Sequence, residues 1–209
     1  MDAGPPRGLP FNGVEADNDD LKLPARANYA HFTSMQARDG AVRGLDLHLK
    51  RLDDSTRELF GTGLDPDRVR ACLRHALRAS PDAVTARVTV FSRRQDAVLR
   101  GEHTEPDLAV TTTAPLDART SPVRLRTTTY ERDLPHVKHS GTFGLSLRRR
   151  AVLDGYDDVL FTDRDGRISE ASISPAVPVA RIDETALTVD PDVTALLVKC
   201  YESNPWQPL

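Results

Sequence analysis

The stretch Tyr29-Ala-His-Phe-Thr-Ser-Met-Gln-Ala-Arg-Asp-Gly-Ala-Val-Arg43 predicts a β-hairpin near the start of the chain. Its arms meet at Asp39-Gly40, a dipeptide that supplies the positive φ angles that tight hairpin turns require. A helix is expected directly afterwards, because leucines and a phenylalanine recur at helical spacing over residues 45–60 and glycines follow. A hairpin followed by a covering helix indicates an α+β lobe.

The rest of the chain continues the mixture of helices and strands. The first 23 residues are rich in Pro, Gly, Asp and Asn, which predicts a loose segment with one short strand at its end. Helical spacing and β-branched runs then predict further elements in chain order. These are a helix over 66–79, strands over 84–92, 107–113 and 123–130, a helix over 143–153, a hairpin over 159–170, a strand over 177–182 and a helix over 191–201.

Charge and cysteine content exclude several classes of protein. The 28 basic and 31 acidic residues are interspersed and the net charge is -3, so a surface for nucleic acid or anionic lipid is not expected. Residues 1–13 lack the apolar stretch of a signal peptide, and no run of about 18 apolar residues predicts a membrane span. Cys72 and Cys200 lie outside metal-ligand spacings and fit a reducing compartment. We therefore expect a cytoplasmic protein without a metal site.

One lysine has a sequence context that fits covalent chemistry. In His136-Val-Lys-His-Ser-Gly-Thr-Phe-Gly144, Lys138 lies at the end of an expected strand and before small residues, which let a ligand or another backbone approach closely. A lysine that is desolvated, or that lies beside another cation, can form a Schiff base with an aldehyde at neutral pH. Taken alone, the segment is also typical of an ordinary solvated lysine.

Two further charged residues occupy positions with chemical uses. Glu170 ends the second expected hairpin, and a carboxylate beside a pyridine nitrogen keeps that nitrogen protonated, which makes the ring an electron sink. Arg43 closes the first hairpin where it meets the helix, and a fixed guanidinium there can grip a phosphate with two hydrogen bonds. In isolation, both residues are more typical of surface charges.

Three separated blocks together resemble the class IV aminotransferases. The blocks are Tyr29 to Leu52, then Lys138 with its small-residue turn and helix, then Gly155-Tyr-Asp-Asp-Val-Leu-Phe-Thr-Asp163 with the hairpin that ends at Glu170. Their order and spacing match that family over residues 11–173. The family includes branched-chain and D-amino-acid aminotransferases and aminodeoxychorismate lyase. Three motifs in register are much more specific than any single one.

The resemblance implies a two-lobed fold-type IV enzyme that binds pyridoxal 5'-phosphate (PLP). Residues 1–119 would form an α/β sandwich lobe and residues 120–209 a β-barrel-like lobe that holds the cofactor. By resemblance, Lys138 would hold PLP covalently and move a proton as a general base and acid. Arg43 would bind the cofactor phosphate, and Glu170 would pair with the pyridine nitrogen.

The resemblance also implies residues around the substrate. His31 and Phe32, at the end of the hairpin, would line the substrate pocket, and Arg87 would face a substrate carboxylate. His48 and Arg51 match the family's helix motif His-Leu-x-Arg-Leu. We expect these last two to be structural, with His48 hydrogen-bonded to backbone.

Two features depart from the family pattern. Phe143 stands where many members have a tyrosine or asparagine, which removes a possible hydrogen bond to the cofactor oxygen. After Glu170, the family's Asn-Ile-Phe-like strand and the loop that binds the phosphate at a helix N-terminus are missing. Ser169–Ser174 runs instead into Pro175–Asp183, which resembles the family's far C-terminal strand. We therefore predict an incomplete second lobe with an internal gap of roughly 60 residues near residues 173–176. A real deletion would weaken PLP binding, whereas a stretch merely left out of the sequence would leave the intact enzyme ordinary.

The expected function is PLP-dependent transfer of an amino group between an amino acid and a 2-oxo acid, in a homodimer. The sequence leaves open a lyase that acts on an aminated ring, because both reactions use the same lysine chemistry and differ in the bond that breaks. It also leaves open a non-catalytic member that keeps the fold as a binding or structural protein. No residue identified in the sequence fixes the substrate's side chain.

Overall fold

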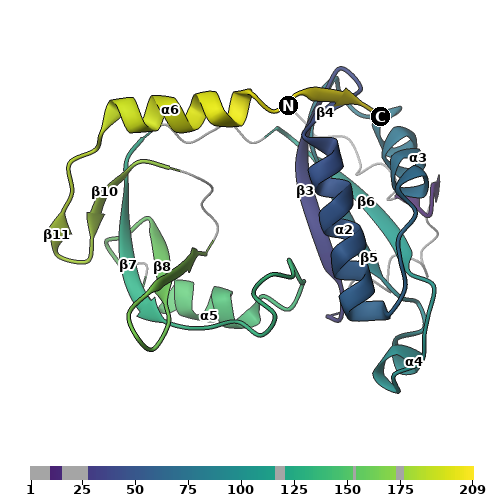
Figure 1. Ribbon diagram of the computed structural model, residues 1–209, viewed down its shortest axis with the longest axis horizontal. Coiled ribbons are helices and arrows are strands. Elements are labelled where there is room, and N and C mark those ends of the chain that lie inside the picture. The colour runs from purple at the N-terminus through teal and green to yellow at the C-terminus, as the bar shows by residue number, and fades with distance from the viewer. Residues whose placement is uncertain (1–9, 16–27, 116–120, 153, 173–176) are drawn as a thin grey trace, which may run out of the picture. The chain divides into compact units, whose positions relative to one another are not determined.

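The structure, a computed structural model, describes residues 10–15, 28–115, 121–152, 154–172 and 177–209. The chain forms two compact units, which are described separately (Figure 1). The first comprises Met1–Leu116, Val137–Gly141 and Pro205–Leu209, and the second comprises Asp117–His136 and Thr142–Asn204. The division at residue 116 lies close to the boundary predicted at 119. Two short segments that the sequence assigned to the second lobe fold with the first unit instead.

The first unit is built on a seven-stranded antiparallel sheet with the order β12-β4-β3-β5-β6-β1-β2. The predicted hairpin is confirmed, with Asp39 and Gly40 at positive φ angles of 49° and 72°. The first residues of the described chain were predicted to be loose, but they form a second hairpin that ends the sheet. The strands are β1 Pro10–Phe11, β2 Val14–Glu15, β3 His31–Arg38, β4 Ala41–Arg43, β5 Ala83–Phe91, β6 Asp107–Thr113 and β12 Trp206–Pro208.

Helices α2 (Leu45–Phe60) and α3 (Pro66–Leu77) cover one face of this sheet. Both helices were predicted from the sequence, whereas the short helix α4 (Gln95–Leu99) was not. Because side chains alternate between the two faces of a strand, every second residue of β3 and β5 points toward the helices. The resulting core joins residues of both helices to Met35, Ala37, Val42, Val84, Ala86, Val88, Val90, Leu108 and Val110. The opposite side of the sheet is called the distal face below.

The second unit holds a five-stranded sheet with the order β11-β10-β7-β8-β9. Strand β7 pairs in parallel with both β8 and β10, and the β7–β8 connection contains α5, as a parallel pair requires a crossover. No residue of α6 is buried. The elements are β7 Val123–Thr129, α5 Phe143–Val152, β8 Asp158–Thr162, β9 Ile168–Ala171, β10 Val179–Ile182, β11 Thr185–Ala186 and α6 Pro191–Glu202.

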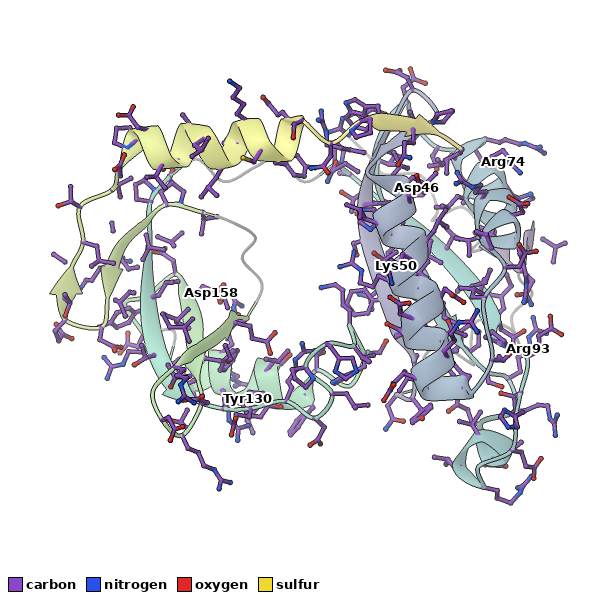
Figure 2. All side chains as sticks on the ribbon, in the orientation of Figure 1. Asp46, Lys50, Arg74, Arg93, Tyr130 and Asp158 are labelled. Carbon is purple, nitrogen blue, oxygen red and sulfur yellow. The ribbon has the colours of Figure 1, made fainter. Side chains whose placement is uncertain are left out.

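A buried carboxylate connects three parts of the second unit. Asp158 on β8, labelled in Figure 2, is 2% exposed. Its Oδ1 accepts hydrogen bonds from Ser172 Oγ, just after β9, and from Arg149 Nε on α5 at 3.3 Å. A buried charge is tolerated only with such partners. Asp158 therefore fixes the end of β9 and the face of α5 against the sheet.

The helix-covered core of the first unit predicts a contrast between two leucines of α2. Leu52 is fully buried and Leu47 is 64% exposed. Leu52→Ala should lower the free energy of unfolding by about 2–5 kcal/mol, because it leaves a cavity against β3. Leu47→Ala should change it by less than about 0.5 kcal/mol. Urea unfolding followed by circular dichroism measures both, and equal effects would contradict the packing described.

Candidate active site

Lys138 is fixed to the first unit through its backbone. The N–H of Phe32 donates to the carbonyl of Lys138 at 2.9 Å, and the N–H of Ser140 donates to the carbonyl of Ala30 at 2.7 Å. Residues His31 and His139 form an isolated antiparallel bridge between these bonds. The Lys138 segment thus extends the sheet beside the start of β3, which is why Val137–Gly141 leaves the second unit.

The side chain of Phe32 brings two cations together on the distal face. The guanidinium carbon of Arg87 lies 3.5 Å from the centroid of the Phe32 ring, and Lys138 Nζ lies 5.0 Å from the same centroid. Arg87 reaches the ring diagonally, since Phe32 pairs with Thr89 and Ser34 pairs with Arg87. Both contacts are within the range of cation–π attraction. Three predicted site residues, Phe32, Arg87 and Lys138, are therefore neighbours.

Arg87 is half-buried among these groups. Burial lowers the pKa of its guanidinium below the usual value, although an arginine stays charged at neutral pH. A second cation near Lys138 disfavours a charged amine, which is one way to activate a lysine. The arrangement thus supplies a neighbouring cation, which is one of the two alternative ways to activate a lysine for Schiff-base chemistry.

His31 lies on the other side of the sheet from Phe32. It is 1% exposed, and its Nε2 lies 3.0 Å from Thr56 Oγ1 on α2. The Thr56 hydroxyl donates its hydrogen to the carbonyl of Leu52, so its oxygen accepts from His31. Nε2 of His31 therefore carries the hydrogen. Burial lowers the pKa of His31 to about 4, so the ring is neutral at pH 7. The structure does not bring His31 together with Lys138, and the alternation of β3 accounts for this.

A polar network lies next to His31 under the same helix. Thr33 Oγ1 and Arg51 Nη2 contact His48 Nδ1 at 2.7 and 2.9 Å, and Arg51 Nη2 also donates to Thr33 Oγ1. Since arginine only donates, His48 Nδ1 is an acceptor; burial, aided by the charge of Arg51, lowers the pKa of His48 to about 4. His48 and Arg51 hold α2 on β3, in the supporting position expected. The partners of His48 are side chains, not the backbone expected, and Thr33 had no signal in the sequence.

Arg43 lies at the opposite end of β3 from Phe32. Its guanidinium carbon lies 4.7 Å above the ring of Trp206, and Trp206 is its partner in the pairing of β12 with β4. The neighbouring pair, Ala37 with Val42, is five residues along β3 from Phe32, or about 16 Å of extended strand. The structure therefore does not bring Arg43 together with Lys138.

Glu170 belongs to the second unit and has a fixed partner there. Its Oε1 accepts from Arg132 Nε at 2.7 Å, and Arg132 Nη2 donates to the carbonyl of Pro135 at 2.9 Å. The side chain of Arg132 is only 10% exposed, which favours a well-defined ion pair. Arg132, six residues before Lys138 in the chain, was not predicted as a site residue.

Tyr130, in the second unit, was also not singled out from the sequence. Tyr130 follows β7 and lies against α5 (Figure 2), where a side chain added at Gly144 would collide with its hydroxyl. Gly144 is thus required for this close approach. The guanidinium carbon of Arg148 lies 4.0 Å from the Tyr130 ring. Phe143, beside Gly144, is 78% exposed.

Some kinds of site are not found in the described part of the chain. It contains no group of three or more His, Cys, Asp or Glu side chains that could hold a metal ion. It also contains no helix with the length and apolar character needed to cross a membrane.

Comparison with known families decides where the chain belongs. The profile of the family "Amino-transferase class IV" matches residues 30–192, which is most of the chain. The chain belongs to the class IV aminotransferases. No curated protein matches this class IV chain. The resemblance drawn from the hairpin, the lysine segment and the Glu170 hairpin is thereby confirmed.

Solved structures show the same fold for this class IV chain. The branched-chain amino acid aminotransferase of the organism abbreviated T.th., solved with N-(5'-phosphopyridoxyl)-L-glutamate, is 17% identical with a TM-score of 0.74, covering 94% of this chain and 93% of that one. The branched-chain aminotransferase of Thermoproteus uzoniensis, solved with norvaline, is 14% identical with a TM-score of 0.73, covering 95% and 94%. An assigned 4-amino-4-deoxychorismate lyase of Legionella pneumophila is 15% identical with a TM-score of 0.67, covering 84% and 91%. The α+β fold-type IV prediction is confirmed. The predicted gap near residues 173–176 lies outside the described residues.

Burial of His31 predicts a pH-dependent loss of stability. The unfolded chain takes up a proton at this residue below about pH 6.5, whereas the folded protein does so only near pH 4. The stabilising contribution is therefore complete above pH 6.5 and falls as the pH drops toward 4, by at most about 3 kcal/mol. His31→Gln should reduce the fall in the free energy of unfolding between pH 6.5 and 4. The fall that remains in this variant should come from His48, whose pKa burial also lowers. His136→Gln, at an exposed residue, is the control; an unchanged slope in His31→Gln would contradict the buried neutral ring.

Proposed function

We propose that this class IV family member is a PLP-dependent aminotransferase that moves an amino group between an amino acid and a 2-oxo acid. Lys138 carries the proposal, because its backbone is fixed beside β3 and its amine lies over Phe32, near Arg87. Family membership supports it, as do the solved T.th. enzymes with phosphopyridoxyl-glutamate and with pyridoxamine 5'-phosphate.

The residues around Lys138 fit the covalent end of PLP. Ser140 Oγ is buried and has no hydrogen-bond partner among the described residues, so a polar group is left for a ligand two residues from the amine. Gly141 and Ser140 are small enough for close approach. We propose that Lys138 holds PLP, whose aldehyde and pyridine ring supply an electron sink when bound.

Each side chain then has one task in the proposed reaction. Lys138 Nζ accepts a proton from the substrate carbon and returns it, as a general base and acid. Arg87 is proposed to bind the substrate carboxylate. Phe32 is proposed to line the substrate pocket, and its ring positions both the guanidinium of Arg87 and the amine of Lys138. His31 and Arg43 take supporting roles in this proposal, since they lie across the sheet and at the far end of β3.

Glu170 is proposed to bind the pyridine nitrogen. Arg132 occupies its Oε1, and Oε2 has no partner in the part of the chain that the structure describes. The half-exposed carboxylate is thus held in one orientation by a nearly buried guanidinium. A carboxylate at this position stabilises a protonated pyridine nitrogen, which the electron sink requires.

Two other functions have specific support. The Legionella pneumophila neighbour favours a lyase that uses the same lysine on an aminated ring. The exposed Phe143 and the missing phosphate loop favour a non-catalytic member that keeps the fold. We also propose a homodimer, from the family, and a cytoplasmic location, from the charge balance and the two unpaired thiols.

Borohydride reduction in the presence of PLP tests the lysine. The chain has four lysines, Lys22, Lys50, Lys138 and Lys199, so peptide mapping of the reduced protein identifies the labelled one. Label is expected on Lys138, with none on the Lys138→Ala variant and unchanged labelling of Lys50→Ala, because Lys50 is exposed and paired with Asp54 on α2. Wild-type protein that stays unlabelled would favour the non-catalytic function.

Glu170→Gln tests the electronic role separately from binding. Labelling of Lys138 should persist, whereas amino transfer from L- and D-amino acids to 2-oxo acids should fall by roughly a hundredfold or more, because an amide does not stabilise a protonated pyridine nitrogen. Asp165→Asn, in the exposed turn before β9, is the control. Full activity in Glu170→Gln would show that Glu170 does not act in the site. Cleavage of an aminated ring substrate without amino transfer would favour the lyase.

A further inference from the structure

Arg132 is a nearly buried cation in the loop between β7 and the Lys138 segment. Its side chain is 10% exposed and donates from two nitrogens, from Nε to Glu170 Oε1 at 2.7 Å and from Nη2 to the carbonyl of Pro135 at 2.9 Å. Because the guanidinium is planar, the directions of the two donors are fixed relative to each other. One side chain therefore joins Glu170 to the backbone just before Lys138.

The backbone on both sides of this ion pair is held by the second sheet. Glu170 lies on β9, where it pairs with Phe161 of β8. The N–H of Tyr130, two residues before Arg132, donates to the carbonyl of Thr162 at the end of β8 at 2.9 Å. The carboxylate and the guanidinium thus meet on neighbouring strands, and the carboxylate has a fixed direction.

Stability alone is a weak reason for such a pair. Taking a carboxylate and a guanidinium out of water costs free energy that offsets much of their attraction. An arginine only donates hydrogen bonds, so Arg132 occupies one oxygen of Glu170 and leaves the other as an acceptor. Glu170 Oε2 meets no hydrogen-bond donor among the residues that the structure describes. The pair therefore presents one oriented, acceptor-only oxygen to a ligand.

We propose that Arg132 is a positioning residue, which orients Glu170 so that Oε2 accepts a hydrogen bond from the protonated pyridine nitrogen of PLP. The inference rests on the proposed function, because it assumes that Glu170 binds the cofactor ring. Arg132 acts through the direction of the carboxylate and not through its own charge, since a nearby cation by itself disfavours a protonated nitrogen. Without the guanidinium, the carboxylate is free to turn and the ring nitrogen loses its proton more easily.

The protonation of the ring nitrogen tests this role. PLP labelled with nitrogen-15 in the ring is attached to Lys138 by borohydride reduction, so that NMR compares all variants at full occupancy and neutral pH. Arg132→Gln should move the chemical shift from the wild-type value toward that of Glu170→Gln. Amino transfer by the unreduced variant should fall by roughly tenfold to a hundredfold, as misplaced catalytic groups do. The same substitution made in Glu170→Gln should change neither quantity further.

Two more variants separate orientation from charge and from general disturbance of the second unit. Arg167→Gln is the matched control, because Arg167 precedes β9 but is 76% exposed and pairs with Asp165; it should leave the chemical shift unchanged. Arg132→Lys keeps the charge but has one donor group in place of the fork, so it should recover only part of the wild-type shift. It supplies the same comparison if Arg132→Gln does not fold.

The outcomes distinguish this role from the function on which it rests. An unchanged chemical shift in Arg132→Gln, a change toward fuller protonation, or complete recovery in Arg132→Lys would overturn the role of Arg132 and leave the proposed function standing. Wild-type protein in which Lys138 takes no label would contradict the proposed function itself, and the role of Arg132 with it.

Discussion

Two backbone hydrogen bonds, from Phe32 to Lys138 and from Ser140 to Ala30, fix the position on which the candidate active site depends. Both bonds join backbone atoms, so the position of the lysine segment beside β3 does not depend on side-chain hydrogen bonds. The side chain of Lys138 is left on the distal face, where Phe32 and Arg87 meet it. The chemistry proposed for this protein follows from that one pairing between distant parts of the chain.

Local signals in the sequence were sufficient for most of the fold. Asp39-Gly40 fixed the turn of the hairpin, and the spacing of the leucines predicted α2 with the bounds that the structure has. Strand β12 and the pairing of the lysine segment were missed because both depend on partners more than 90 residues away in the chain. Short strands of this kind have no local pattern, since their stability comes from the sheet they join.

The candidate site was predictable only where a local pattern in the sequence positions the side chain. Alternation along β3 already implies that His31 and Phe32 point to opposite faces, so a stricter reading of the two-residue period would have separated them. No such rule could place Arg43, because its partner Trp206 is brought to it only by the fold. Arg132 was likewise hidden, since an arginine in a loop looks like any surface charge until its burial is known.

The interleaving of the two units has a consequence for how the protein is made. The chain passes between them at residues 116, 136, 141 and 204, and the edge strand β12 consists of residues 206–208. Domains generally fold in order as they leave the ribosome, but this first unit lacks its edge strand until residues 206–208 have emerged. The sheet edge at β4 therefore stays unpaired while residues 44–205 are synthesised, so nascent chains carry a site for unwanted strand pairing that β12 later closes.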